Sequence, residues 1–231
     1  MPGTLFVVAT PIGNLKDMTA RAKETLESVN VIACEDTRVT SKLLNAYGIK
    51  KPLMAVHQHT TAERQSAVVG KLLKGEDVAY VSDAGTPGVN DPGGKLVEEA
   101  MSYGVKVVPI VGASALTAAI SVCGFPMERY QYLGFAPHKK GRQTFFKEIS
   151  EYPEATVFFE STHRLLKALE SLRDVLHPER MVCVCREMTK LHETIYRGVA
   201  ADVLSEVQKT SAKGEAVIII APLRYNNSNN I

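Results

Sequence analysis

Loops that follow apolar runs carry most of the residues in this sequence that could do chemistry. The most unusual of these loops begins with the carboxylate of Asp83 and is rich in glycine and proline from Ala84 to Gly93. Glycine lets a backbone approach a ligand closely, while proline restricts the path of the chain. The composition alone is equally consistent with a plain strand-to-helix connection. As a binding element, such a loop would act through backbone groups that approach the ligand closely.

Three further loops of this kind follow other apolar runs. They are Thr10–Leu15, Glu35–Arg38 and Val111–Ala115. In open α/β sheets, ligands bind outside the carboxyl ends of the strands, where the strand order reverses. We therefore expect the four loops to form a site at one edge of a sheet.

Motifs for several other kinds of chemistry are missing from the sequence. Neither G-x-G-x-x-G nor G-x-x-x-x-G-K-[ST] occurs, so a phosphate-bearing cofactor is not indicated. Ser114 lies in Gly-Ala-Ser-Ala and not in a G-x-S-x-G elbow, which gives hydrolase chemistry little support. His57 and His59 could share one strand face, but no further histidine or cysteine is placed to complete a metal site. We therefore expect no metal.

The elements that must position these loops form an alternating pattern in the first half of the chain. Short runs rich in valine and isoleucine alternate with amphipathic stretches of helical spacing, as in a mostly parallel sheet with helices on its faces. The predicted strands are Leu5–Thr10, Val31–Glu35, Leu53–His57, Val78–Asp83 and Val105–Val111. A helix over 113–122 follows, and Gly124 and Pro126 then break the pattern. We predict an α/β domain over residues 1–122.

A second set of strands follows this break, and we predict a second α/β domain over residues 123–231 that ends in a polar tail. Its predicted strands are Tyr130–Ala136, Thr156–Ser161, Met181–Glu187, Thr194–Val199 and Ala216–Ala221.

Length and composition agree with two modest domains. The chain has 231 residues, of which 45% are hydrophobic and 23% charged, as is usual for soluble globular proteins. No apolar run approaches the roughly 18 residues of a membrane span, and no secretory signal pattern opens the chain, so we expect a cytoplasmic protein. We expect the four cysteines to be reduced thiols, because they do not resemble a disulfide framework.

Taken together, the loops resemble the tetrapyrrole methylase superfamily of S-adenosylmethionine-dependent methyltransferases. Within it, the chain is most similar to the branch that methylates a cytidine ribose in small-subunit (16S) ribosomal RNA. Short blocks in the same order over nearly the whole chain carry the resemblance: 8–15, 34–38, 81–88, 109–115, 158–164, 186–193 and 214–216. Each block alone is a weak signal of the family, but seven blocks in the right order are a specific one. The blocks at 82–88 and 35–38 favour the RNA branch over the tetrapyrrole branch.

The resemblance implies a mostly parallel sheet in the first domain, a mixed sheet in the second and S-adenosylmethionine bound in a cleft between them. The cofactor contacts that it implies are Pro11, Asp83, Ala84, Gly85, Ser114, Ala115, Phe159, Met188 and Pro222. Physics is compatible with this ligand. S-adenosylmethionine carries no phosphate, whereas its adenine and sulfonium need apolar walls and directed backbone hydrogen bonds. The resemblance also implies a homodimer.

Methylation of a ribose requires a group that accepts the proton of its hydroxyl. The candidates lie at or just beyond strand ends in the second domain: Lys190, His192, Glu160 and Glu187. Surface ion pairing explains any one of these residues equally well.

Contact with ribosomal RNA or with an assembled small subunit must be local, because the net charge is only +2. The turn Lys139–Arg142 is basic and could meet phosphates. The side chains that could add a basic rim are Arg38, Arg164 and Arg186. A solvated basic loop is the alternative explanation of the turn.

Two other classes of protein remain open at this point. One is a C-methyltransferase that acts on a tetrapyrrole, which would need an apolar trough and would have less use for the basic turn. The other is a catalytically silent RNA-binding module that kept the fold. Binding of S-adenosylmethionine separates the silent module from both enzymes, and comparison of RNA with precorrin-type substrates separates the enzymes.

Overall fold

The chain folds into two compact units, Met1–Ser114 and Ala115–Ile231. The computed structural model describes residues 1–56, 62–91, 93–210 and 213–225, and the side chains of 62–66 are not among what it describes. The sequence placed the junction after residue 122, whereas this division falls before helix α5 (Ala115–Cys123), which contacts strands of the second unit. None of the helices in the described ranges is long and apolar enough to cross a membrane.

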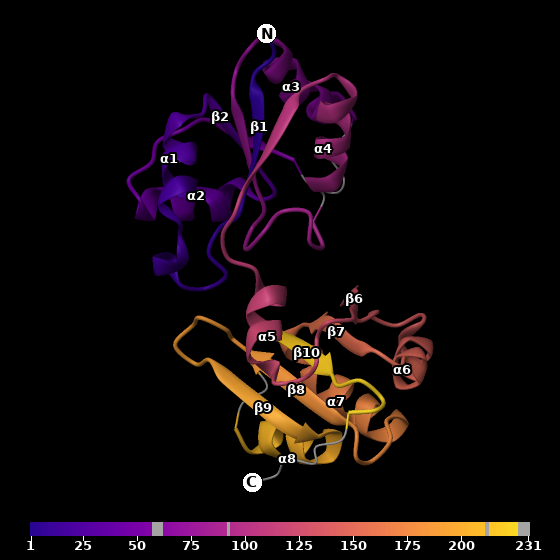
Figure 1. Cartoon of the computed structure of the whole chain (residues 1–231). Coiled ribbons are helices and arrows are strands. Elements are labelled where there is room, and N and C mark those ends of the chain that lie inside the picture. Colours follow the sequence, from indigo (N-terminus) through magenta and orange to yellow (C-terminus); the bar gives the residue numbers. More distant parts are fainter. Residues whose placement is uncertain (57–61, 92, 211–212, 226–231) are drawn as a thin grey trace. The chain divides into compact units, whose positions relative to one another are not determined.

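The first unit is built on a parallel sheet of five strands in the order β3-β2-β4-β1-β5. Figure 1 labels β1 and β2 of this sheet and the helices α1 to α4 around it. The strands are β1 (Thr4–Val8), β2 (Val31–Cys34), β3 (Leu53–Ala55), β4 (Val78–Val81) and β5 (Lys106–Ile110). All their pairings are parallel. The prediction of a mostly parallel first sheet is therefore confirmed.

Helices cover both faces of this sheet. They are α1 (Ala20–Ser28), α2 (Thr37–Ala46), α3 (Ala62–Leu73) and α4 (Gly93–Ser102). Side chains alternate across each strand, so Ala33 packs in the cluster with α3 and α4 while Cys34 packs with α1 and α2. Strands β1 and β4 are neighbours, yet their chains continue into helices on opposite faces. The strand order therefore reverses between β1 and β4, which is where ligands bind in open α/β sheets.

The second unit is built on a mixed sheet of five strands in the order β6-β7-β10-β8-β9. The strands are β6 (Tyr130–Phe135), β7 (Ala155–Glu160), β8 (Met181–Arg186), β9 (Thr194–Val199) and β10 (Ala216–Ile220). The β6–β7 pair is parallel and the other pairs are antiparallel, which confirms the predicted mixed sheet.

One face of the second sheet packs against three helices. They are α6 (Arg142–Glu151), α7 (Leu165–Val175) and α8 (Ala200–Lys209). Phe158, Leu169 and Ile218 lie in their common core. Helix α5 contacts β8 and β10 instead, where Cys123 lies near Cys183. All four cysteines are free and buried, as expected of reduced thiols.

A buried arginine fixes the end of α6. The guanidinium of Arg180 donates to the carbonyl oxygens of Ile149, Ser150 and Tyr152 at 2.9–3.1 Å, and to that of Ala221 at 3.0 Å. Burial lowers the pKa of this guanidinium. The carbonyl groups at a helix C-terminus carry partial negative charge, so they suit a cation there.

Candidate functional site

Three of the predicted loops meet at the carboxyl edge of the first sheet. The backbones of Thr10 and Gly85 exchange hydrogen bonds at 2.9 and 3.0 Å, which joins the loops after β1 and β4. The hydroxyl of Thr86 donates to the carbonyl of Ala113 at 3.0 Å and so adds the loop after β5. Gly85 has φ +79°, and a Cβ there would lie 3.2 Å from the Ile12 side chain. The junction therefore depends on glycine at this position.

The predicted cofactor contacts of the first unit differ in exposure. Pro11 and Gly85 are buried, whereas Asp83 and Ala84 are exposed beside them. Ser114 is half-buried at the end of this unit, and Ala115 begins α5 in the other. The structure thus gathers Pro11 and the stretch 83–85 at one place, with one exposed carboxylate.

The glycine-rich loop after β4 is held by Asp91. Its two carboxylate oxygens accept the amide hydrogens of Gly88 at 2.7 Å and Gly93 at 2.8 Å. The hydroxyl of the fully buried Tyr80 lies 3.4 Å from the same carboxylate. A Cβ on Gly93 would lie 2.4 Å from the Tyr80 ring. The loop is therefore held in a defined shape by specific contacts.

Carboxylates from two loops gather at this edge. The amide of Asp36 donates to Asp83 Oδ1 at 3.1 Å. Partial burial raises the pKa of the Asp83 carboxyl although much of its side chain is exposed, and burial together with the charges of Asp83 and Asp91 raises that of Glu35. Arg38 binds Asp36 instead and lowers its pKa to about 2. An edge where ionised carboxylates are crowded favours a bound cation. Composition and spacing had not singled out Glu35 for this role.

In the second unit, Glu160 is fully buried between two arginines. Its Oε1 lies 2.9 Å from Arg164 Nη2 and accepts the Ser161 amide hydrogen at 2.7 Å. Its Oε2 lies 2.9 Å from Arg142 Nη1, a charge contact outside hydrogen-bond geometry. Both oxygens thus face cations. The carboxylate that the sequence offered as a proton acceptor is held in an ion-pair network.

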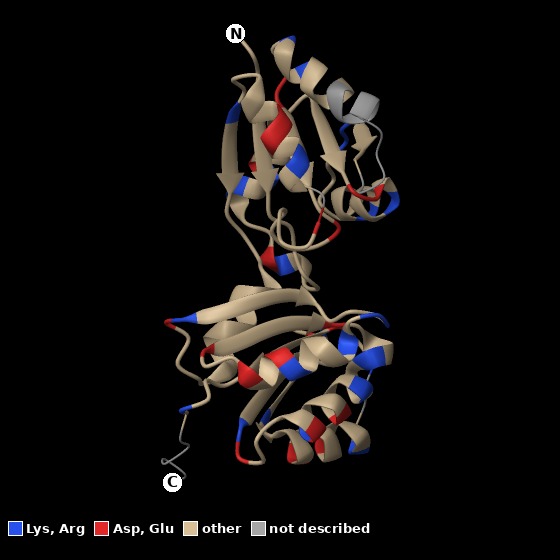
Figure 2. Ribbon diagram, turned by 90° about the vertical axis from the view of Figure 1, so that its right-hand side faces the viewer, with Lys and Arg blue, Asp and Glu red and all other residues tan. Residues whose placement is uncertain are grey.

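The two arginines predicted to meet RNA also bind the backbone near β6. Arg142 donates to the carbonyl of Pro137 and Arg164 to that of Ala136, each at 3.0 Å. Each side chain is only 15% exposed. The structure therefore leaves Lys139 and Lys140 as the exposed cations of the basic turn. Lysine and arginine positions occur in both units, interspersed with aspartate and glutamate (Figure 2).

Arg186 is likewise buried and holds the loop between β8 and β9. It donates to the carbonyls of Lys213 and His192 and to the hydroxyl of Thr194, at 2.7–3.1 Å. Glu187 and Thr189 in this loop have φ of +52° and +66°, a conformation that non-glycine residues rarely adopt. Met188 between them is 9% exposed. The loop has a defined shape that Arg186 helps to maintain.

Lys190 pairs with two carboxylates of the second unit. Its Nζ lies 2.8 Å from Glu187 Oε1 and 3.5 Å from Glu215 Oε2. Burial alone would lower the pKa of Lys190, but these carboxylates outweigh burial and raise it. The ammonium therefore stays protonated, which suits a hydrogen-bond donor and disfavours a proton acceptor. His192 is exposed in the same loop.

The remaining predicted contacts are Phe159 and Pro222, both half-buried. Phe159 packs edge-to-face against Tyr132 and Phe135, with ring centroids 5.3 and 5.4 Å apart. Among the described residues, no group of three or more His, Cys, Asp or Glu side chains could hold a metal. The pair His57 and His59 lies outside the described residues.

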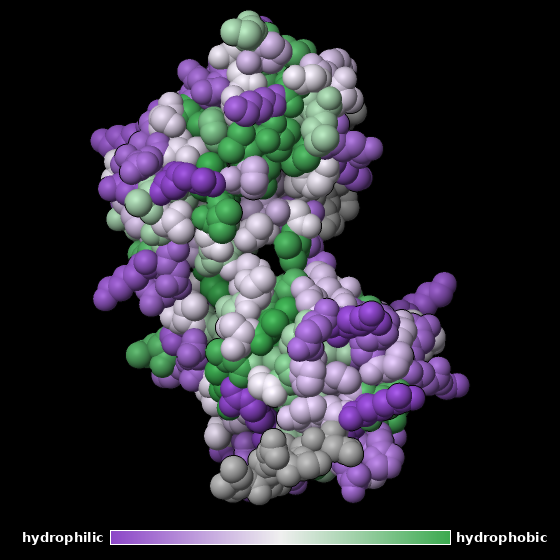
Figure 3. All heavy atoms as spheres, in the orientation of Figure 1, coloured by the Kyte–Doolittle hydropathy of each residue, from purple (hydrophilic) through white to green (hydrophobic). Residues whose placement is uncertain are grey.

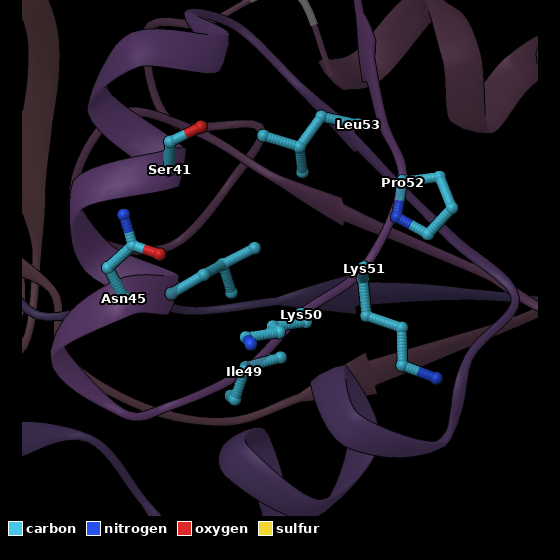
Figure 4. Close-up of a pocket in the computed structure, with 8 residues that line it drawn as sticks. Ser41, Asn45, Ile49, Lys50, Lys51, Pro52 and Leu53 are labelled. Carbon is cyan, nitrogen blue, oxygen red and sulfur yellow. The ribbon is translucent and has the colours of Figure 1, made fainter.

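Two surface cavities lie away from these loops. One of about 410 Å³ lies beside α2 and the segment that leads into β3, at the opposite end of the sheet from the loops (Figure 4). The second, of about 770 Å³, lies between α6 and α7 and includes Lys139 and Lys167 in its wall. Hydrophilic side chains are spread over the visible face with apolar areas between them (Figure 3). Neither cavity contains the predicted cofactor contacts.

Comparison with known proteins gives consistent relatives over nearly the full chain. The family model of the tetrapyrrole (corrin/porphyrin) methylases matches residues 4–204. A ribosomal RNA small subunit methyltransferase I of Escherichia coli O157:H7 is 44% identical, over 94% of this chain and 77% of that protein. The ribosomal RNA small subunit methyltransferase I of Thermotoga maritima is 42% identical, over 95% of this chain and 98% of that protein.

Two solved structures with the same fold are methyltransferases of tetrapyrroles. A cobalt precorrin-4 methyltransferase of cobalamin biosynthesis superposes with a TM-score of 0.70 at 14% identity, covering 94% of each chain. A uroporphyrin-III C-methyltransferase from Thermus thermophilus gives 0.64 at 17% identity, covering 95% of this chain and 94% of that one. At these identities the likeness concerns the fold. The fold, the order of the loop sequences along the chain and the relatives that match nearly the whole chain agree: this chain is a methyltransferase of the tetrapyrrole methylase family, in the branch of the ribosomal RNA small subunit methyltransferase I proteins.

Proposed function

We propose that this enzyme transfers a methyl group from S-adenosylmethionine to the 2′-hydroxyl of a cytidine ribose in small-subunit (16S) ribosomal RNA. The observation that carries the proposal is the contrast between its two sets of relatives. Small-subunit ribosomal RNA methyltransferases are 42–44% identical to this chain, whereas the structurally similar precorrin-4 methyltransferase is 14% identical. A substrate shared with the first group explains this difference better than a tetrapyrrole does.

The carboxyl edge of the first sheet suits the methyl donor. S-adenosylmethionine brings a methyl group already activated by a positively charged sulfur, so no metal is needed for its transfer. Pro11, Ala84 and Gly85 would hold it through apolar and backbone contacts. Asp83 and Glu35 would attract its positive charge, because the folded protein crowds these carboxylates and a cation relieves their repulsion. Phe159, Met188 and Pro222 of the second unit, with Ser114 and Ala115, stay predicted contacts.

Proton acceptance from the ribose hydroxyl is assigned to His192. Of the candidates, Glu160 faces two guanidinium groups and Lys190 is held protonated by carboxylates. His192 is exposed in a loop whose backbone Arg186 fixes. Histidine is also the side chain that ordinarily exchanges a proton near neutral pH. Lys190 would then act as a hydrogen-bond donor, and Glu160 would position its neighbours.

The proposal extends to the setting in which the enzyme works. With ribosomal RNA as its substrate, the enzyme would work in the cytoplasm, on free RNA or on an assembled small subunit. The homodimer implied by the family resemblance belongs to the same proposal, and sedimentation of the purified protein tests it.

Loss of one ribose methyl group is the expected result of deleting the protein from its cell. Mapping 2′-O-methylation along the small-subunit ribosomal RNA with and without the protein should show one cytidine that changes. A wild-type plasmid should restore the mark. An unchanged methylation map, with activity on a precorrin-type substrate in vitro, would assign the enzyme to tetrapyrroles instead.

Binding of S-adenosylmethionine should not depend on metal, because the proposed contacts are apolar groups, backbone and carboxylates. We expect titration calorimetry to give the same dissociation constant with and without a chelator. A chelator-sensitive constant would contradict this site. No binding under either condition would instead indicate a catalytically silent RNA-binding module.

A further inference from the structure

A β-bulge near the end of β6 turns an aromatic side chain onto one face of the sheet. Tyr132 pairs with Val157 and Phe135 with Phe159, so three steps along β6 oppose two steps along β7. Without the extra residue, Tyr132 and Phe135 would point to opposite faces. Gly134 supports the bulge with φ +66°. The bulge therefore places both rings on the face that carries Phe159.

The three rings form a cluster with one ring held out to solvent. Phe159 contacts both Tyr132 and Phe135 edge-to-face, at centroid distances of 5.3 and 5.4 Å. Phe135 is nevertheless 50% exposed. Phe159 holds the Phe135 ring in place, while part of the Phe135 surface stays free for a flat partner.

Exposed cations follow this aromatic cluster within the same segment. Lys139 and Lys140 lie in the turn between β6 and α6 and are both exposed. Between the ring and the lysines, the carbonyls of Ala136 and Pro137 are bound by Arg164 and Arg142. Because Glu160 holds both arginines, the backbone at 136–137, between the ring and the turn, is held in place.

We propose that the segment 135–140 binds a single strand of RNA, with a base stacked on Phe135 and phosphates bound by Lys139 and Lys140. An exposed aromatic ring followed by exposed cations in the same segment matches the alternation of flat base and charged phosphate along a single strand. The proposal rests on the proposed function and adds how the RNA is recognised. Arg142, Arg164 and Glu160 act as positioning residues in it and do not contact RNA.

The test measures RNA and cofactor affinity of the full-length protein and its Phe135 variants. The probe is a fluorescently labelled single-stranded RNA of mixed sequence that contains cytidine. Phe135→Ala should weaken RNA binding roughly tenfold or more, the usual cost of losing one base–aromatic stack. Phe135→Tyr keeps a ring and should bind as wild type, whereas Phe135→Leu keeps only apolar volume and should bind as weakly as alanine. Tyr103→Ala, at a residue 57% exposed in the first unit, is the matched control.

Salt dependence separates the stacked base from the phosphates. Lys139→Ala with Lys140→Ala should lower the log–log salt slope by roughly 0.7 per lost contact, while Phe135→Ala should leave the slope unchanged. S-adenosylmethionine affinity should stay constant in the lysine double variant and in Phe135→Tyr, which keeps a ring against Phe159. Unchanged RNA affinity in Phe135→Ala, wild-type behaviour of Phe135→Leu, or a loss of cofactor affinity in the lysine double variant would overturn the inference. Failure of the wild-type protein to bind RNA would overturn the proposed function itself.

Discussion

Glu160→Ala is expected to lower the free energy of unfolding of the second unit by about 3–5 kcal/mol, because it leaves two largely buried guanidinium groups without their counter-charge. Both groups lie 2.9 Å from the carboxylate, which has no exposure of its own. Urea unfolding followed by circular dichroism measures the change. Glu215→Ala removes a carboxylate that is 79% exposed and should cost far less.

A double-mutant cycle shows whether this cost belongs to the network. Glu160→Ala combined with Arg142→Ala should destabilise by less than the sum of the single changes, since the second change removes a cation that the first one left unpaired. Additive losses would mean that the two side chains act independently. If Glu160→Ala instead kept its stability and lost only the rate of methyl transfer, Glu160 would be the proton acceptor and His192 would not.

Much of the fold was predictable because its signals are local. All ten predicted strands are present, and Thr194–Val199 has the predicted ends. Alternating apolar side chains in short runs rich in β-branched residues identify a strand without knowledge of its neighbours. The other strands end one or more residues from the predicted positions, since a strand ends where its partner's hydrogen bonds end.

The roles of charged residues were less predictable, because they depend on contacts between distant parts of the chain. Arg142 follows two lysines in sequence and was grouped with them, yet its partner is Glu160 at the end of β7. Arg186 was assigned to a surface rim but binds three acceptors and is 6% exposed. Residue type and spacing cannot show which cation a buried acceptor selects.

The aromatic cluster was missed for a related reason. Regular alternation along β6 would separate Tyr132 from Phe135, so the sequence offered no shared face for these rings. The signal that could have indicated the bulge is Gly134, since glycine inside a predicted strand often marks one. In contrast, the loops after β1, β4 and β5 were expected to meet, because parallel strands bring their carboxyl ends to one edge.

The second large effect is expected from Asp83→Asn, which should weaken S-adenosylmethionine binding roughly thirtyfold. A hydrogen bond from the ammonium or a ribose hydroxyl of S-adenosylmethionine to the Asp83 carboxylate would be charge-assisted and worth about 1.5–3 kcal/mol, and the substitution removes the charge. The asparagine oxygen can still accept the Asp36 amide hydrogen that Asp83 Oδ1 accepts at 3.1 Å, so the loop should keep its shape. Titration calorimetry measures the affinity. Asp77→Asn is a control, since Asp77 is a carboxylate that accepts the Thr4 amide hydrogen at 2.7 Å elsewhere in the same unit.

Stability should change in the opposite direction from affinity. Burial raises the pKa of Asp83 in the folded protein, so the folded chain binds more protons than the unfolded chain between the two pKa values. Ionisation of Asp83 above that window therefore costs stability, and Asp83→Asn should unfold at a higher urea concentration than wild type at pH 7.

The affinity of the wild-type protein for the cofactor should fall as the pH is lowered through the raised pKa of Asp83. This fall should be smaller in Asp83→Asn, where protonation of Glu35 alone causes it. A variant that loses both stability and affinity would show that Asp83 holds the loop together, and unchanged affinity would remove Asp83 from the cofactor site.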